Sequence, residues 1–159
     1  MKTMMKRIAV LALALVMLFA VTACGSSAAE ELKYSQDIVK LMNELTDSAN
    51  TFSADLNTFF EDITEENREM IMSDLDKMET AYKNISALKA PANYAEFQKL
   101  LNESADSAFK AIEVYRTELG TVTEDTLDQA FLDRVTEGDV HMQAAAQKLL
   151  DASALMGEE

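Results

Sequence analysis

Few residues in this chain have side chains suited to covalent or metal chemistry. Cys24 and His141 are the only cysteine and the only histidine, whereas 28 Asp and Glu residues accompany 14 Lys and Arg residues. Zinc sites usually need several Cys or His ligands, and a di-iron bundle needs two Glu-x-x-His motifs. The sequence also shows no glycine-rich loop or strand-turn-helix elbow that would expose a nucleophilic serine. We therefore expect a protein that is not an enzyme and has no catalytic residues, resident metal or cofactor.

Cys24 follows a segment with the three parts of a secretory signal. Lys2, Lys6 and Arg7 form a basic start, an apolar stretch covers residues 8–21, and small residues precede the cysteine. The apolar stretch has about 14 residues, fewer than the roughly 20 that a bilayer-spanning helix needs. A cleaved signal at residues 1–23 is therefore favoured over a permanent membrane span.

The order Val-Thr-Ala-Cys at residues 21–24 resembles the lipobox of bacterial lipoproteins. This resemblance implies that signal peptidase cuts before Cys24 and that the cysteine sulfur carries diacylglycerol, a durable anchor once two or three acyl chains are present. Residues 24–29 would then be the lipidated cysteine and a flexible spacer. The apolar leader and the Gly-Ser-Ser after the cysteine also resemble lipoproteins of Firmicutes, which implies the outer face of the cell membrane in a Gram-positive bacterium.

The charge of the chain limits its partners. Without the three basic residues of the leader, 11 Lys and Arg would face 28 Asp and Glu, a formal charge of −17. Such a surface repels nucleic acid and anionic lipid headgroups, so membrane contact is left to the lipid on Cys24. We expect no nucleic-acid partner and a neutral or basic protein or envelope partner. The alternative is that the acidic residues only keep the surface soluble.

Four segments carry apolar residues at helical spacing, and one proline and few glycines interrupt them. The stripes are Ile38, Met42, Leu45, Ala49, Phe52, Leu56 and Phe59 in residues 30–60; Ile71, Leu75, Met78, Tyr82, Ile85 and Leu88 in residues 64–90; Phe97, Leu101, Ala105, Ala108, Ile112, Tyr115 and Leu119 in residues 92–120; and Leu127, Phe131, Val135, Gly138, Met142, Ala145, Leu149, Ala152 and Met156 from residue 123 onward. No segment alternates with the period of a strand.

Local signals mark where these helices begin and end. Thr64 is a predicted N-cap, Pro91 ends the second helix, and Gly120 is predicted to adopt a left-handed conformation after the third. Thr123 is predicted to open the fourth helix. Gly138 could kink or split that helix, because glycine costs about 1 kcal/mol relative to alanine, but we expect one helix.

Short links between long amphipathic helices make neighbours antiparallel. We therefore predict an all-α fold, an antiparallel up-down-up-down four-helix bundle that forms one domain over residues 30–159. A three-helix array with a detached helix is the alternative.

This topology places the turns near residues 60–63 and 120–122 at the end far from the anchor. Acidic residues gather there, with Arg68 and Arg116 nearby. We predict a docking surface for a basic partner or for divalent cations, whereas the alternative is that acids in a first helical turn only stabilise the helix dipole. Carboxylate pairs elsewhere are expected to be solvated. The predicted docking residues are Glu61, Asp62, Glu65, Glu66, Glu69, Glu124, Asp125 and Asp128.

His141 and Met42 lie at the same height in such a bundle, about 26 Å from the distal turns at 1.5 Å per residue. This pair resembles the axial ligands of cytochrome b562-type bundles, so a carrier of haem or another small apolar ligand is the alternative function. The other interpretation is that His141 is half-exposed and forms a structural hydrogen bond without binding a ligand. A c-type attachment is excluded because Cys-x-x-Cys-His is absent.

The segment Leu-Lys-Ala-Pro-Ala-Asn-Tyr-Ala-Glu-Phe-Gln-Lys-Leu-Leu at residues 88–101 resembles a segment of small helical lipoproteins of Firmicutes. This resemblance supports the helical fold and the surface location, and we expect Tyr94 and Phe97 to be core anchors at the membrane end. The favoured function is a lipid-anchored extracytoplasmic bundle that serves as a non-catalytic binding or structural module.

Overall fold

The computed structural model describes residues 26–156 as four long helices and two 3-10 turns, with no strand in that range. The helices are α2 (Ser26–Glu61), α3 (Glu65–Ser86), α4 (Ala95–Thr121) and α5 (Gln129–Leu155), and the 3-10 turns are η2 (Ala92–Tyr94) and η3 (Glu124–Thr126). The predicted signal segment and Cys24 lie outside the described residues. Within residues 26–156, no helix combines the length and hydropathy that crossing a bilayer requires.

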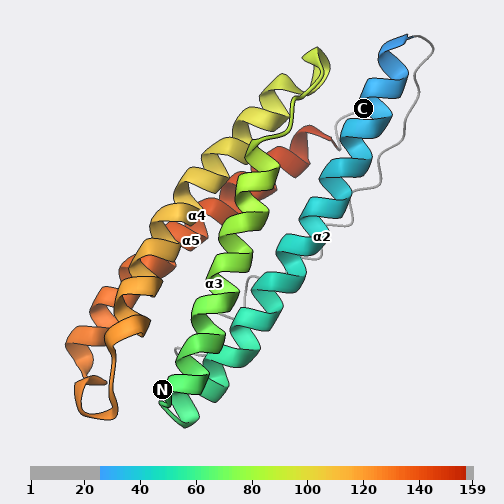
Figure 1. The fold of residues 1–159 in the computed structure, drawn as a ribbon. Helices are drawn as coiled ribbons and strands as arrows, with labels where there is room; N and C mark the ends of the chain where they lie inside the picture. The colour runs from blue at the N-terminus through green and yellow to red at the C-terminus, as the bar shows by residue number, and fades with distance from the viewer. Residues whose placement is uncertain (1–25, 157–159) are drawn as a thin grey trace.

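Successive helices run in opposite directions, which is the predicted up-down-up-down four-helix bundle (Figure 1). Helix α3 packs against both α2 and α4, and α4 packs most extensively against α5. Helices α2 and α5 meet through Phe60 and Phe131, whose ring centroids are 6.2 Å apart. The alternative with a detached helix is therefore wrong.

The predicted apolar stripes form the core. Every stripe residue is buried except Ala49, Leu88, Leu127 and Met156, and these four pack against the edge of the core. Because the spacing of four and three residues keeps one face of each helix toward its neighbours, the periodicity identified the core face correctly.

One predicted helix start is confirmed, whereas two predicted helix ends are wrong; the first of these is the end of α3, which lies at Ser86 and not next to Pro91. Thr64 is the N-cap of α3, and its hydroxyl accepts a hydrogen bond from the Asn67 N–H at 3.2 Å. The prediction for Gly120 is wrong, because α4 extends past it to Thr121, and Val122, which is 2% exposed, is the C-cap. The helix therefore ends where the chain turns into the core at Val122.

The prediction that the fourth helix opens at Thr123 is also wrong. Thr123 and Thr126 form a reciprocal capping box around η3, a single 3-10 turn. Helix α5 begins later, at Gln129, where the Asp128 carboxylate accepts a hydrogen bond from the Phe131 N–H at 2.8 Å. The loop therefore contains two successive N-caps, Thr123 for η3 and Asp128 for α5, and the second one begins the long helix.

Gly138 does not split α5, which is continuous across it. A Cβ atom at Gly138 would stand 2.6 Å from Cε1 of Tyr115, so the absence of a side chain makes room for that ring. The Tyr115 hydroxyl donates to Asp139 Oδ1 at 2.7 Å, and its ring lies 5.8 Å from the Phe52 ring. Gly138 is thus a close-approach position between α4 and α5.

An aromatic cluster lies at the end of the bundle where α2 begins. Tyr34 lies 5.2 Å from Tyr94 and 6.5 Å from Phe97, measured between ring centroids. The Tyr34 hydroxyl donates to Gln98 Oε1 at 2.7 Å, and Gln98 Nε2 donates to the Ile85 carbonyl at 3.0 Å. The predicted packing of Tyr94 and Phe97 against the core is therefore confirmed.

Candidate functional site

The turn between α2 and α3 and the turn between α4 and α5 lie at the same end of the bundle (Figure 1). We call this end the acidic tip. It carries the predicted docking residues, all of which are exposed: Glu61, Asp62, Glu65, Glu66, Glu69, Glu124, Asp125 and Asp128.

Arg68 ties the two turns of the acidic tip together. Its guanidinium donates hydrogen bonds to the carbonyls of Leu119 and Val122, the second through Nη2 at 2.7 Å. Its guanidinium carbon also lies 5.5 Å from the centroid of the Phe59 ring, and the side chain is only 16% exposed. Arg68 was predicted only to be a positive charge near the acidic residues. In the structure it is the hydrogen-bond donor to carbonyls at the end of α4.

Arg116, the second guanidinium predicted near the acidic tip, binds α3 instead. Its Nη2 lies 2.6 Å from Asp76 Oδ1 and 2.9 Å from Glu79 Oε2. Glu79 also pairs with Lys83, and the hydrogen bonds from Lys83 and then Arg116 hold the pKa of Glu79 below its usual value. Arg116 therefore joins α3 to α4 and pairs with none of the carboxylates of the acidic tip.

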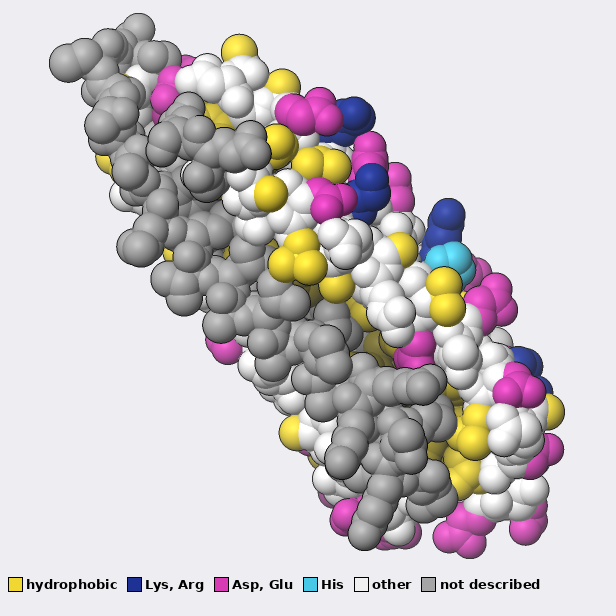
Figure 2. All heavy atoms as spheres, turned by 180° about the vertical axis from the view of Figure 1, so that it is seen from behind, with side chains coloured by type: hydrophobic (Ala, Val, Ile, Leu, Met, Phe, Trp, Pro, Cys, Tyr) yellow, Lys and Arg dark blue, Asp and Glu magenta, His cyan; other side chains and the backbone are white. Residues whose placement is uncertain are grey.

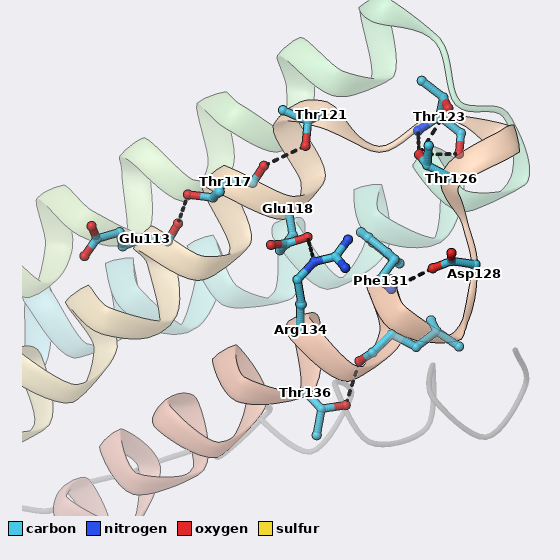
Figure 3. A network of polar contacts seen from close by, with 11 residues as sticks. Glu113, Thr117, Glu118, Thr121, Thr123, Thr126, Asp128, Phe131, Arg134 and Thr136 are labelled. Carbon is cyan, nitrogen blue, oxygen red and sulfur yellow. Dashed lines mark hydrogen bonds and ion pairs between the residues drawn. The ribbon is translucent and has the colours of Figure 1, made fainter.

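Polar contacts hold the connection between α4 and α5 in place (Figure 3). Arg134 Nε lies 2.7 Å from Glu118 Oε2, across the two helices. The Thr123–Thr126 box and the Asp128 cap follow one another along the loop. This loop is therefore fixed by side-chain contacts on both sides of η3.

The carboxylates of the acidic tip fall into two groups. Asp128 caps α5, and Glu65 lies 3.4 Å from Arg68 Nε. The others form no ion pair among the described residues; they are Glu61, Asp62, Glu66, Glu69, Glu124 and Asp125. This second group presents an open negative surface.

The helix dipole explains only part of this surface. Glu65 and Glu66 occupy the first turn of α3, where a negative charge is stabilised. Glu124 and Asp125 lie in the three-residue turn η3, and the first turn of α5 contains no acidic residue. The alternative, in which a helix dipole accounts for these acids, therefore applies to Glu65 and Glu66 but not to the long helix α5.

The carboxylates of the acidic tip do not converge on a point. Over residues 26–156, no three or more His, Cys, Asp or Glu side chains are grouped so that they could hold a metal ion.

His141 borders an open groove of about 380 Å³ between α4 and α5. Figure 2 shows this histidine at the surface, beside cationic and anionic side chains. Met42, the other member of the predicted haem pair, is buried in the core and does not line this groove. The groove residues are Lys110, Glu113, Val114, Thr117, Glu118, Arg134, Glu137 and His141.

A second open groove, of about 510 Å³, follows the seam between α2 and α3. All of its lining residues except Ala81 are polar or charged, and both grooves are open to solvent. Its residues are Glu44, Asp47, Ser48, Ser73, Asp76, Lys77, Thr80, Ala81 and Asn84.

One carboxylate pair departs from the expectation of solvated charges. Asp74 of α3 is 1% exposed, and its Oδ1 accepts a hydrogen bond from Lys77 Nζ at 2.7 Å. Asp55 of α2 is half-buried, and its carboxyl group neighbours that of Asp74. Burial raises the pKa of Asp55, and the neighbouring Asp74 carboxyl group raises it further, whereas Lys77 lowers it.

The signal for this pair was present in the second apolar stripe. Asp74 lies three residues after Ile71 and four before Met78, so it occupies a stripe position on α3. The stripe was defined by its apolar residues, so Asp74 was not recognised as part of the buried face. A charged residue at such a position is a candidate for a buried, paired group.

Comparison with known proteins yields no relative for this chain: no family model, no curated protein and no solved structure matches it significantly.

Proposed function

We propose that this protein is a lipid-anchored helical bundle on the outer face of the cell membrane and acts as a non-catalytic binding or structural module. The observation that carries the proposal is the Val-Thr-Ala-Cys run at residues 21–24, which follows a basic start and an apolar stretch. Helix α2 begins at Ser26, so the prediction of a flexible spacer is wrong for residues 26–29, which are helical.

The acidic tip is the proposed docking surface. Helix α2 has 36 residues, so the tip would stand about 50 Å from the start of that helix at 1.5 Å per residue. Carboxylates without ion-pair partners attract a basic surface over a distance set by the salt concentration. A basic or neutral protein or envelope component suits this surface, whereas nucleic acid is repelled.

The anchor is tested with Cys24→Ser in the native host. The wild-type protein is expected in the membrane fraction, with diacylglycerol on the cysteine in the mass spectrum of its N-terminal peptide. The variant is expected to lose that modification. A wild-type N-terminal peptide with an unmodified sulfur would refute the anchor.

The docking surface is tested by crosslinking in intact cells. The test variant neutralises five tip residues, and the control neutralises five exposed acids elsewhere on the bundle. Partner capture should fall in the first variant and persist in the second, because only the first removes the tip charge. Equal capture by both would exclude the acidic tip as the docking surface. The test residues are Glu61, Glu66, Glu69, Glu124 and Asp125, and the control residues are Glu30, Asp47, Asp106, Glu113 and Glu137.

The alternative, a carrier of haem or another small apolar ligand, has weaker support. His141 lines an outer polar groove, and Met42 belongs to the packed core of the bundle. We therefore expect that haemin added to the purified protein produces no shift of the Soret band. A saturable shift that Met42→Leu abolishes would favour the carrier instead.

A further inference from the structure

The buried end of Asp74 lacks a hydrogen-bond donor. Lys77 occupies Oδ1 of this carboxyl group, but Oδ2 is buried and receives no hydrogen bond from any N–H or O–H group among the described residues. Burying a carboxylate oxygen without a hydrogen-bond donor costs free energy, because the oxygen loses its bound water and gains no hydrogen bond in exchange. The structure therefore calls for a donor at this point of the α2–α3 seam.

Asp55 is the neighbour that can supply it. Its carboxyl group, on α2, is the neighbour of the Asp74 carboxyl group across the seam. An ionised carboxylate only accepts hydrogen bonds, so two carboxyl groups can bond to each other only if one of them carries a proton. The O–H of a protonated Asp55 is the donor that Asp74 otherwise lacks.

We propose that Asp55 and Asp74 share one proton across the seam and form an acid-strengthened link between α2 and α3. When the proton is bound, Asp55 donates to Asp74 and the two helices are joined. When it leaves, two negative charges face each other in a partly buried site, and the packing of α2 on α3 is weakened.

The charges around the pair are few. Among the described residues, the charged groups that act on Asp55 are Asp74 and Lys77, both on α3. Lys77 is already held by Asp74, and Arg116 of α4 is held by Asp76 and Glu79. One shared ammonium therefore faces two carboxyl groups, so loss of the proton leaves a net negative charge.

The direction of the pH effect follows from the pKa of Asp55, which is raised in the folded protein. A group with a raised folded-state pKa contributes stability that is complete below its unfolded pKa, about 3.9 for Asp, and lost as the pH rises through the folded value. This link therefore strengthens on acidification, whereas most carboxylate ion pairs weaken.

The test compares the full-length protein with Asp55→Asn, because an asparagine amide donates to Asp74 at every pH. As the pH rises from about 4, the free energy of unfolding of the wild type is expected to fall relative to that of Asp55→Asn. Asp47→Asn is the matched control, since Asp47 is an exposed acid of the same helix. Parallel pH profiles for the wild type and Asp55→Asn would refute the proposal.

A carboxyl NMR titration of the wild-type protein tests the same proposal without a variant. The carboxyl signal of Asp55 is expected to titrate above the ordinary pKa of an aspartate, about 3.9. Titration of Asp55 at that ordinary value would show that the two carboxyl groups share no proton. Neither measurement depends on the anchor or on the docking surface, so both remain valid if the proposed function fails.

Discussion

Gly138 shows how one residue can set the distance between two helices. The ring of Tyr115 occupies the space that a side chain at position 138 would fill. Burial raises the pKa of the Tyr115 hydroxyl, and the charge of Asp139 and the hydrogen bond to it raise it further. The tyrosine therefore stays protonated and continues to donate to Asp139 while its ring lies against α5.

Gly138→Ala is expected to destabilise the protein, although alanine is the better helix former. The added Cβ would force the Tyr115 ring to move, an overpacking effect of about 1–3 kcal/mol. Gly120→Ala is the control, because its Cβ would meet only Met72 Cε at 3.9 Å. It is expected to stabilise α4 by up to about 1 kcal/mol. Urea unfolding measures both changes, and a stabilised Gly138→Ala variant would contradict the close approach.

At the scale of helices and turns, the contacts of Arg68 explain why the ends of α2, α3 and α4 stay together. The side chain starts on α3, lies over a ring of α2 and binds two carbonyls at the end of α4. It thereby gives the acidic tip a fixed shape while adding little positive charge to its surface, because the guanidinium is largely covered.

Arg68→Met keeps the apolar stem and removes the donors. Loss of the charge-assisted hydrogen bonds should lower the free energy of unfolding by about 1.5–3 kcal/mol. Arg134→Met removes an ion pair from an arginine that is 53% exposed, and such pairs contribute about 0–1 kcal/mol. Chemical unfolding of the two variants checks the difference. Similar losses would mean that Arg68 is no more than another surface charge.

At the scale of the whole molecule, opposing pH effects act on the same bundle. Asp55 links α2 to α3 with a proton, whereas Glu79 links α3 to α4 through Arg116 as a carboxylate. The first contribution decreases as the pH rises and the second decreases as the pH falls. The two seams of α3 therefore respond to acid in opposite directions.

Glu79→Gln is expected to reduce the sensitivity of the bundle to acid. Because the pKa of Glu79 is lowered in the folded state, its contribution is complete above its unfolded pKa, about 4.3, and lost as the pH falls through the folded value. Thermal unfolding of the variant should therefore show a smaller decrease in Tm below that pH. Glu69→Gln, which removes an exposed acid of the same helix, should keep the wild-type decrease.

Sequence periodicity determined the core of this protein, because a helix with one apolar face has few ways to bury it. The stripe residues on all four helices are buried or lie at the core edge as predicted, and the short links fixed the antiparallel order. The sequence also placed the eight carboxylates at one end, since that placement requires only helix lengths and turn positions.

Only the tertiary structure decided the ends of helices and the partners of charges. A glycine and a threonine signalled boundaries at residues 120 and 123, but core packing of Val122 and the cap at Asp128 moved them. The roles of Arg68 and of the Asp55–Asp74 pair depend on groups that are far apart in the chain. A local pattern can reveal which face of a helix is buried, but it cannot reveal which polar groups meet there, because those contacts form only when separate helices pack together.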